Sequence, residues 1–172
     1  MSNPFLDAQT AMRDRLAASP VFKDGANVLI PLTTEDPKDP SAEVLMQLYR
    51  YGFVSNSAGK AGIAVAVLTL TGQRAEDSRT ALFHGLLTQR IWIRENLAMN
   101  RDAVAGIGVG AWDVLWAVLG QLQGWSPGKG NQVLQFDAFA TDLDPERTVL
   151  DLFVDFGWNR SFSPPLSQPP KP

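Results

Sequence analysis

The chain has 172 residues, 45% of them hydrophobic, which is enough for one domain with a substantial core and too few for two ordinary domains. A net charge of −3 and a pI near 5.1 provide no basic field for attracting phosphates, so general nucleic-acid binding is disfavoured. The absence of cysteine excludes disulfides and thiolate metal sites.

No segment predicts export or membrane insertion. Charges at Asp7, Arg13 and Asp14 interrupt the N-terminal stretch, where a secretory signal needs a continuous apolar run. No apolar run approaches the roughly 18 residues of a membrane span. We therefore expect synthesis in the cytoplasm and no membrane partner.

The first elements expected along the chain are a helix and a short strand. Apolar side chains recur at three- and four-residue spacings over residues 4–18, which is typical of an amphipathic helix. They are Phe5, Ala8, Met12 and Leu16. Residues 27–31 carry three aliphatic side chains before a proline and predict a strand, and the polar residues 33–40 predict a loop.

A second helix and a buried strand are expected next. Pro40 is placed to start a short helix that ends before Gly52. Residues 63–71 are aliphatic and β-branched with little charge, which predicts a strand that is buried on both faces or covered by a helix. The polar residues 72–80 predict a connection.

A long half-buried strand is expected over residues 82–95, because apolar and polar side chains alternate there. One face carries Leu87, Ile91 and Ile93, and the other carries Thr88, Arg90, Trp92 and Arg94. Residues 96–110 have no period and end in a glycine-rich stretch, so they predict a loop.

The clearest helix is expected over residues 112–122, ended by Gly124. Its predicted sheet-facing side chains are Trp112, Leu115, Trp116, Leu119 and Leu122. Residues 132–139 and 148–157 then predict two strands of a hairpin, joined by a turn that contains an Asp-Pro step.

The composition changes at Asn159, since five of the last nine residues are proline. This divides the chain into a single domain, 1–158, and an extended tail, 159–172, which is either frayed or lies as an arm along a neighbouring subunit. Together the elements predict an α+β fold. It has an antiparallel or mixed β-sheet with an amphipathic helix packed on one face, an N-terminal helix and a C-terminal β-hairpin.

Two apparent ligand motifs are better explained by structure. Gly106, Gly108 and Ala111 spell G-x-G-x-x-A, but no strand directly precedes them and no acid follows at ribose-binding distance, so no dinucleotide site is expected. The acids of the hairpin turn lack the glycine and closing glutamate of a calcium loop and predict a solvated turn. These acids are Asp142, Asp144 and Glu146.

Neither do the remaining titratable residues predict chemistry. Asp137, Asp151 and Asp155 fall on one side of the hairpin, where solvent-facing alternation explains them better than a carboxylate pair does. His84, the single histidine, has no nucleophile or ligand near it in sequence. We predict no catalytic residue, no cofactor and no metal.

The strongest candidates for an interaction surface lie on and after the long strand. A tryptophan between two arginines is typical of a subunit interface, and equally of a cross-strand cluster inside one subunit. The candidate interface residues are Arg90, Trp92, Arg94, Asn100 and Arg101.

From Ile91 the sequence reads IWIRENLAMNRDAVAGIGVGAWDVLWAVLGQLQGWSP and later DLFVDFGW. With the N-terminal helix, this order of strand, Asn100-containing loop, helix and alternating strand resembles the tail terminator and tail completion proteins of long-tailed phages and prophages. The helix end at Gly124-Trp125-Ser126-Pro127 is part of the likeness.

The resemblance implies a structural virion protein made in the host cytoplasm. It would form a ring, by analogy a hexamer, that caps the head-proximal end of the tail tube, stops its polymerisation and joins it to the neck. Its partners would be copies of itself, the tail tube protein and neck or head-completion proteins, with genomic DNA passing through the pore without sequence-specific binding.

Two alternatives remain open at this point. One is a neck or head-completion connector protein. The other belongs to a different class, a small monomeric enzyme or ligand-binding domain with a pocket between the helix at 112–122 and the sheet.

Overall fold

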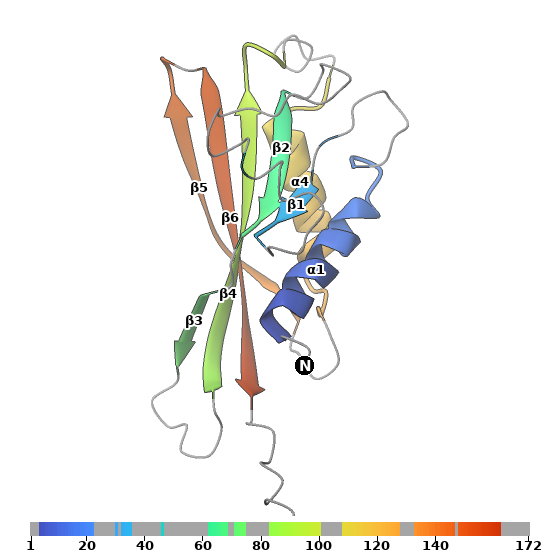
Figure 1. The fold of residues 1–172 in the computed structure, drawn as a ribbon, viewed down its shortest axis with the longest axis vertical. Helices are drawn as coiled ribbons and strands as arrows, with labels where there is room; N and C mark the ends of the chain where they lie inside the picture. The colour runs from blue at the N-terminus through green and yellow to red at the C-terminus, as the bar shows by residue number, and fades with distance from the viewer. Residues whose placement is uncertain are drawn as a thin grey trace, which may run out of the picture.

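A six-stranded mixed β-sheet with two helices on one face forms the part of the chain that the computed structural model describes (Figure 1). That part comprises residues 4–22, 30, 32–35, 46, 62–68, 71–74, 83–100, 108–127, 133–146 and 148–162. The predicted α+β class, with its N-terminal helix, its helix on the sheet and its C-terminal hairpin, is confirmed.

The elements in chain order are α1 (Pro4–Ala17), β1 (Leu32–Thr34), β2 (Ile63–Val67), β3 (Thr71–Arg74), β4 (Phe83–Asn96), α4 (Ala111–Leu122), β5 (Gln135–Asp144) and β6 (Val149–Phe162). The strand order is β1-β2-β4-β6-β5, with β3 also paired to β4. β1 and β2 are parallel and all other pairs are antiparallel, so the sheet is mixed.

The centre of the sheet is the long antiparallel pair β4–β6. Its register runs without a shift from Phe83 opposite Phe162 to Asn96 opposite Val149. The predicted alternation of β4 is confirmed, because the side chains of Leu87, Ile91 and Ile93 are buried in the core beneath the helices. β5 pairs with the outer side of β6, with a bulge between Phe136 and Ala138.

Both helices bury aliphatic side chains against this sheet. The predicted stripe of α1 is confirmed at Ala8, Met12 and Leu16, which are buried in one core cluster with β2, β4, β6 and α4. The strand β2 is buried along its whole length, as expected for a strand covered on both faces. No helix among the described residues is long and apolar enough to cross a membrane.

A polar contact inside the core ties α1 to the sheet. The carbonyl of Leu68, directly after β2, accepts hydrogen bonds from Gln9 Nε2 of α1 at 2.6 Å and from Gln89 Nε2 of β4. Both glutamines are buried, so these bonds satisfy amide nitrogens that would otherwise destabilise the core. These bonds fix α1 beside Leu68, between the part of β4 that pairs with β2 and the part that pairs with β3.

The buried face of α4 agrees only in part with the predicted one, because Leu115 and Leu122 are buried and Leu119 packs against the core. Trp112 and Trp116 are 48% and 72% exposed, so their assignment to the core is wrong. The buried side chains of α4 are Ala111, Val114, Leu115, Val118 and Leu122. The helix is apolar around most of its circumference, and the face with smaller side chains is the one that approaches the sheet closely.

Three strand boundaries also differ from prediction. The first described strand is Leu32–Thr34, with Thr33 and Thr34 buried, so it includes two residues that were predicted to be loop. The strand predicted over 27–31 lies outside the described residues apart from Ile30, which is buried and not part of a strand. β2 ends at Val67, and β3 lies largely within the stretch read as a polar connection. β3 is polar because its side chains at Thr71 and Gln73 are exposed.

The C-terminal hairpin is longer than predicted. β5 continues to Asp144 and β6 to Phe162, so the first residues of the predicted tail, 159–162, pair with β4. The remaining tail lies outside the described residues, as does the predicted second helix apart from Met46, which is helical. The division into a domain and a tail stays a prediction.

The orientation of α4 is tested by two neighbouring substitutions. Leu115 is 6% exposed, so Leu115→Ala should lower the free energy of unfolding by about 2 to 5 kcal/mol. Trp116→Ala should change the free energy of unfolding by no more than about 0.5 kcal/mol, because the exposed indole makes few packing contacts that the substitution would remove. Urea denaturation of both variants measures this, and a larger loss for Trp116→Ala than for Leu115→Ala would contradict the observed packing.

Candidate interaction surfaces

A row of charged and aromatic side chains lies on the sheet face opposite the helices. The antiparallel register places Arg90 opposite Asp155, Trp92 opposite Phe153, and Arg94 opposite Asp151. We call these six residues the charged ladder. It contains three of the five candidate interface residues, joined to partners on β6.

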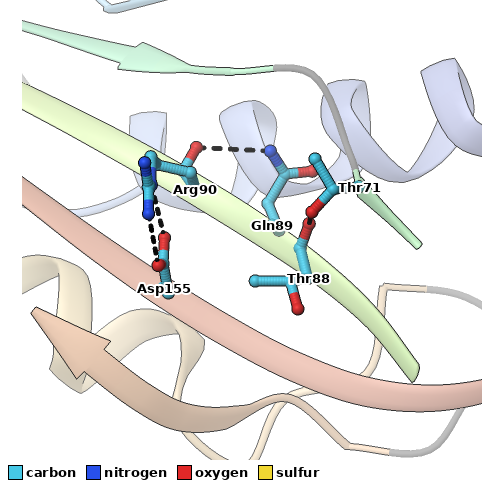
Figure 2. Close-up of polar contacts among 5 residues, drawn as sticks. All are labelled: Thr71, Thr88, Gln89, Arg90 and Asp155. Carbon is cyan, nitrogen blue, oxygen red and sulfur yellow. Dashed lines mark hydrogen bonds and ion pairs between the residues drawn. The ribbon is translucent and has the colours of Figure 1, made fainter. Parts of the chain in front are cut away.

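The outer end of the charged ladder is a two-pronged ion pair, shown in Figure 2. Arg90 Nε and Nη2 donate to the two carboxylate oxygens of Asp155, each at 2.8 Å. The hydrogen bonds to Asp155 raise the pKa of Arg90 above its ordinary value. The Arg90 side chain is nevertheless 51% exposed, so its outer side is open to solvent or to a partner.

A hollow of about 320 Å³ lies beside this pair. It is lined by Glu35, Leu68, Thr71, Thr88, Arg90 and Asp155. Thr71 Oγ1 donates to the Thr88 carbonyl at 3.3 Å, which ties β3 to β4 at its edge (Figure 2). The hollow is open to the surface of the protein.

The other end of the charged ladder is more deeply buried. Asp151 is 7% exposed and accepts from Arg94 Nε at 2.6 Å, Arg94 Nη2 at 2.5 Å and Trp92 Nε1 at 2.7 Å. Three donors therefore compensate one buried carboxylate. The expectation that the three aspartates face solvent is wrong for Asp151, which is buried. Asp137 is exposed as expected, and Asp155 is partly exposed in its pair with Arg90.

The side chains of the charged ladder also stack in series. The Cζ atom of Arg94 lies 4.6 Å from the ring centroid of Trp92, and the Trp92 and Phe153 centroids are 6.2 Å apart with planes inclined by 11°. The Cζ atom of Arg90 lies 5.6 Å from the Phe153 centroid. The charged ladder is thus a cross-strand cluster within the subunit, and its role as an interface between subunits stays a prediction.

Asn100 is held by a network that fixes the start of α4. Its Nδ2 donates to Glu95 Oε1 at 2.6 Å and to the Val109 carbonyl at 2.9 Å. Glu95, which is 3% exposed, also accepts from the Ala111 backbone N–H at 2.9 Å. Both ends of the loop after β4 are thereby attached to one buried carboxylate. The other loop candidate, Arg101, lies outside the described residues.

Two further details support this network. Asp113 Oδ2 accepts from the Gly110 N–H at 2.9 Å, so a second carboxylate stabilises the positive end of α4. A Cβ atom on Gly62 would lie 2.5 Å from the Cβ atom of Asn100, so glycine is required for their close approach. The sequence predicted a loop at residues 96–110, but it did not indicate that Glu95 anchors the start of α4.

A second surface is apolar and lies where α4 meets β5. Its residues are Trp112, Trp116, Phe136, Phe139 and Leu143, which are 48%, 72%, 40%, 53% and 56% exposed. We call it the aromatic surface. The Phe139 ring lies edge-on to Trp112 at 6.4 Å and beside Phe136 at 6.5 Å.

Sequence reasoning missed the aromatic surface because it assigned Trp112 and Trp116 to the core, and the other residues to a hairpin strand and its turn. The available signal was that α4 carries apolar residues on more than one face, of which only one can pack on the sheet. β5 is also the last strand of the sheet, and no described strand pairs with its outer side. An exposed edge strand next to exposed aromatic rings is a common protein-binding arrangement.

Of the three acids predicted to lie in the hairpin turn, Glu146 does, whereas Asp142 and Asp144 belong to β5. Asp144 Oδ1 accepts from the Glu146 backbone N–H at 3.0 Å, and the side chain of Asp142 is exposed on β5. No cluster of three histidine or acidic residues that could hold a metal ion occurs in the described ranges. His84 lies near the start of β4, and its side chain is outside the described residues.

The sequence matches no family model and no curated protein. The fold, however, is similar to that of a chain in a solved structure of the virion of a native gene transfer agent particle. The match covers 93% of this chain and 99% of that chain, with a TM-score of 0.59 and 16% sequence identity. At this identity the likeness establishes a shared fold.

The two ion pairs of the charged ladder should differ in their contribution to stability. Arg94→Ala removes the charged partner of the buried Asp151 carboxylate, which keeps only the Trp92 N–H as a donor, and should lower the free energy of unfolding by about 3 kcal/mol. Arg90→Ala removes a half-exposed partner and should cost about 1 kcal/mol or less. Denaturant titration at one pH compares them, and equal losses would show that the burial of Asp151 has no energetic effect.

The Glu95 network predicts a local effect at the start of α4. Glu95→Ala leaves the Ala111 N–H without its acceptor and should lower the free energy of unfolding by about 2 to 3 kcal/mol. The amide of Ala111 should then exchange with solvent faster, as measured by NMR. Asp113→Ala, which removes only the exposed cap, is the matched control and should cost about 1 kcal/mol. Unchanged exchange at Ala111 in Glu95→Ala would refute the proposed anchor.

Proposed function

We propose that this protein is a structural component of a virion, in which it forms the ring that terminates the tail tube. The observation that carries the proposal is the fold shared, over nearly the full length of both chains, with a chain of a virion. The resemblance of the sequence to tail terminator and tail completion proteins supports the more specific role.

The features behind that resemblance occupy defined places in the fold. The long strand β4 ends at Asn96, the Asn100 side chain closes the loop onto Glu95, and α4 ends before Gly124. Gly124 has a φ of +74°, which glycine adopts without strain. Its N–H donates to the Leu134 carbonyl at 2.9 Å, and the Leu134 N–H donates back to Trp125 at 2.8 Å, so the helix end is tied to the approach to β5.

A closed ring needs two different surfaces on each subunit, one meeting the other on the next copy. Two such candidates occur among the described residues, the charged ladder on the sheet face opposite the helices and the aromatic surface at the β5 edge. In the ring, by analogy a hexamer, the interface residues would be Arg90, Trp92, Arg94, Asn100 and Arg101. Of the four whose side chains are described, Arg90 is the one that offers most exposed surface.

The charges are compatible with a pore for DNA. The net charge is −3, and the arginines Arg13, Arg90 and Arg94 are each paired with an aspartate. A surface of this kind does not hold phosphates strongly, so genomic DNA would pass without sequence-specific binding. The tail tube protein would bind one side of the ring and neck or head-completion proteins the other.

The proposed role requires no chemistry from the protein. Its most buried described acids, Glu95 and Asp151, are used to hold a helix and two side chains of β4. Replacement of His84, or of the three acids of the hairpin turn, should therefore leave assembly intact. Loss of assembly in His84→Ala alone would favour the enzyme alternative.

Removal of the protein from an assembling system tests the role directly. Without it, electron microscopy should show tail tubes of uncontrolled length and heads without attached tails. Particles assembled without the protein that have tubes of normal length and full infectivity would contradict the terminator role. Tubes of normal length that only fail to join heads would favour the neck connector alternative.

The contribution of Arg90 to the ring is tested with a charge exchange. Arg90→Glu places two acids opposite each other, whereas Arg90→Glu combined with Asp155→Arg restores a pair within the subunit. If Arg90 contacts a neighbour, the exchanged variant should fold normally yet assemble more weakly, because the charge presented to the neighbour is reversed. Full assembly of the exchanged variant, measured by light scattering, would exclude Arg90 from the interface.

A further inference from the structure

We propose that the aromatic surface binds the proline-rich C-terminal segment, residues 163–172, of a second copy of the chain. The proposal rests on the proposed ring, since it requires two copies side by side. Its starting point is the aromatic surface itself, because Trp112, Trp116 and Phe139 are about half or more exposed, yet two of the rings contact each other in an ordered arrangement. Apolar surfaces of this kind are typical of binding sites.

The aromatic surface continues into a hollow at the edge of the sheet. Phe136, which lies beside Phe139, also lines a hollow of about 230 Å³ where β5 begins and β6 continues beyond it. The hollow is lined by Leu86, Val133, Gln135, Phe136, Asp137, Gly157, Trp158 and Asn159. An extended peptide could therefore follow the rings from α4 along β5 into this hollow.

One of the side chains that line the hollow, Trp158, has a polar group that lacks a partner within the described part of the chain. Trp158 is 3% exposed, and its Nε1 has no hydrogen-bond acceptor among the described residues. A buried N–H without an acceptor is costly, and a carbonyl of a bound peptide would satisfy it. Proline-rich peptides suit this requirement, because proline retains its carbonyl and leaves the acceptor free.

The sequence of the tail matches the chemistry of this surface. Residues 163–172 read SPPLSQPPKP, and Pro169 to Pro172 form a P-x-x-P segment that contains Lys171. Such segments favour the polyproline II conformation and bind grooves lined by aromatic side chains. The exposed charges nearest the aromatic surface in sequence are acidic, at Asp113 and Asp137, which complements Lys171.

The direction of β6 favours binding in trans. Phe139 lies opposite Val154, and β6 continues for eight more residues to Phe162, or about 27 Å farther from Phe139. Figure 1 shows β6 running past β5 toward the lower end of the view. The hollow is nearer to the end of β6, since Asn159 lines it, but two consecutive prolines at 164 and 165 favour continued extension over a reversal of the chain. We therefore assign the segment to the aromatic surface of a neighbouring copy.

The absence of cysteine from the chain allows a direct test by site-specific crosslinking. Gln168→Cys in the tail is mixed with Asp137→Cys in the hollow, and disulfide formation is followed under mild oxidation. Glu146→Cys, exposed at the opposite end of β5, is the matched control. We expect roughly tenfold more covalent heterodimer with Asp137→Cys than with Glu146→Cys, because docking raises the local concentration of the tail.

The inference is supported further if Trp112→Ala and Phe139→Ala remove this preference while the variants remain folded. Equal crosslinking to both positions would overturn it, as would a disulfide that forms only within one chain of the Gln168→Cys, Asp137→Cys double variant. The mass of each sample, measured by light scattering, separates the two proposals. A ring without preferential crosslinking overturns the tail contact alone, and a strict monomer overturns the ring as well.

Discussion

The uninterrupted pairing of β4 with β6 is the constraint on which the rest of the structure depends. Because side chains alternate along both strands, this one register decides that Leu87, Ile91 and Ile93 face the helices and that the charged ladder faces the other side. A shift by one residue would bury the arginines beneath the helices and expose the aliphatic core. The exact opposition of arginine to aspartate and of Trp92 to Phe153 makes such a shift costly.

The same pair also positions both candidate surfaces. At the end of β4, Glu95 accepts the first N–H of α4 and fixes where that helix begins on the sheet. Its aliphatic face then packs on β4 and β6, so Trp112 and Trp116 are left beside the edge strand β5. The aromatic surface is thus a consequence of how α4 is anchored, and it lies on the opposite side of the sheet from the charged ladder.

The sequence predicted the buried face of those elements in which the apolar residues form a single face. The alternation of β4 and the stripe of α1 identified their buried faces, because each has a single apolar face. The orientation of α4 was predicted incorrectly at its tryptophans, because the helix has two apolar faces and its local pattern does not determine which of them packs on the sheet. The partners of Arg90 and Arg94 were not predictable, since they lie on β6 and depend on a strand register that no local pattern encodes.

The charged ladder and the aromatic surface give the subunit two chemically distinct faces, and we propose that these faces serve assembly into a larger particle. A cryo-electron microscopy map of the intact virion is the most direct test of this account. It should show these subunits as a closed ring between the last layer of the tail tube and the neck. Subunits located elsewhere in the particle, or no density for this fold at that position, would contradict the account.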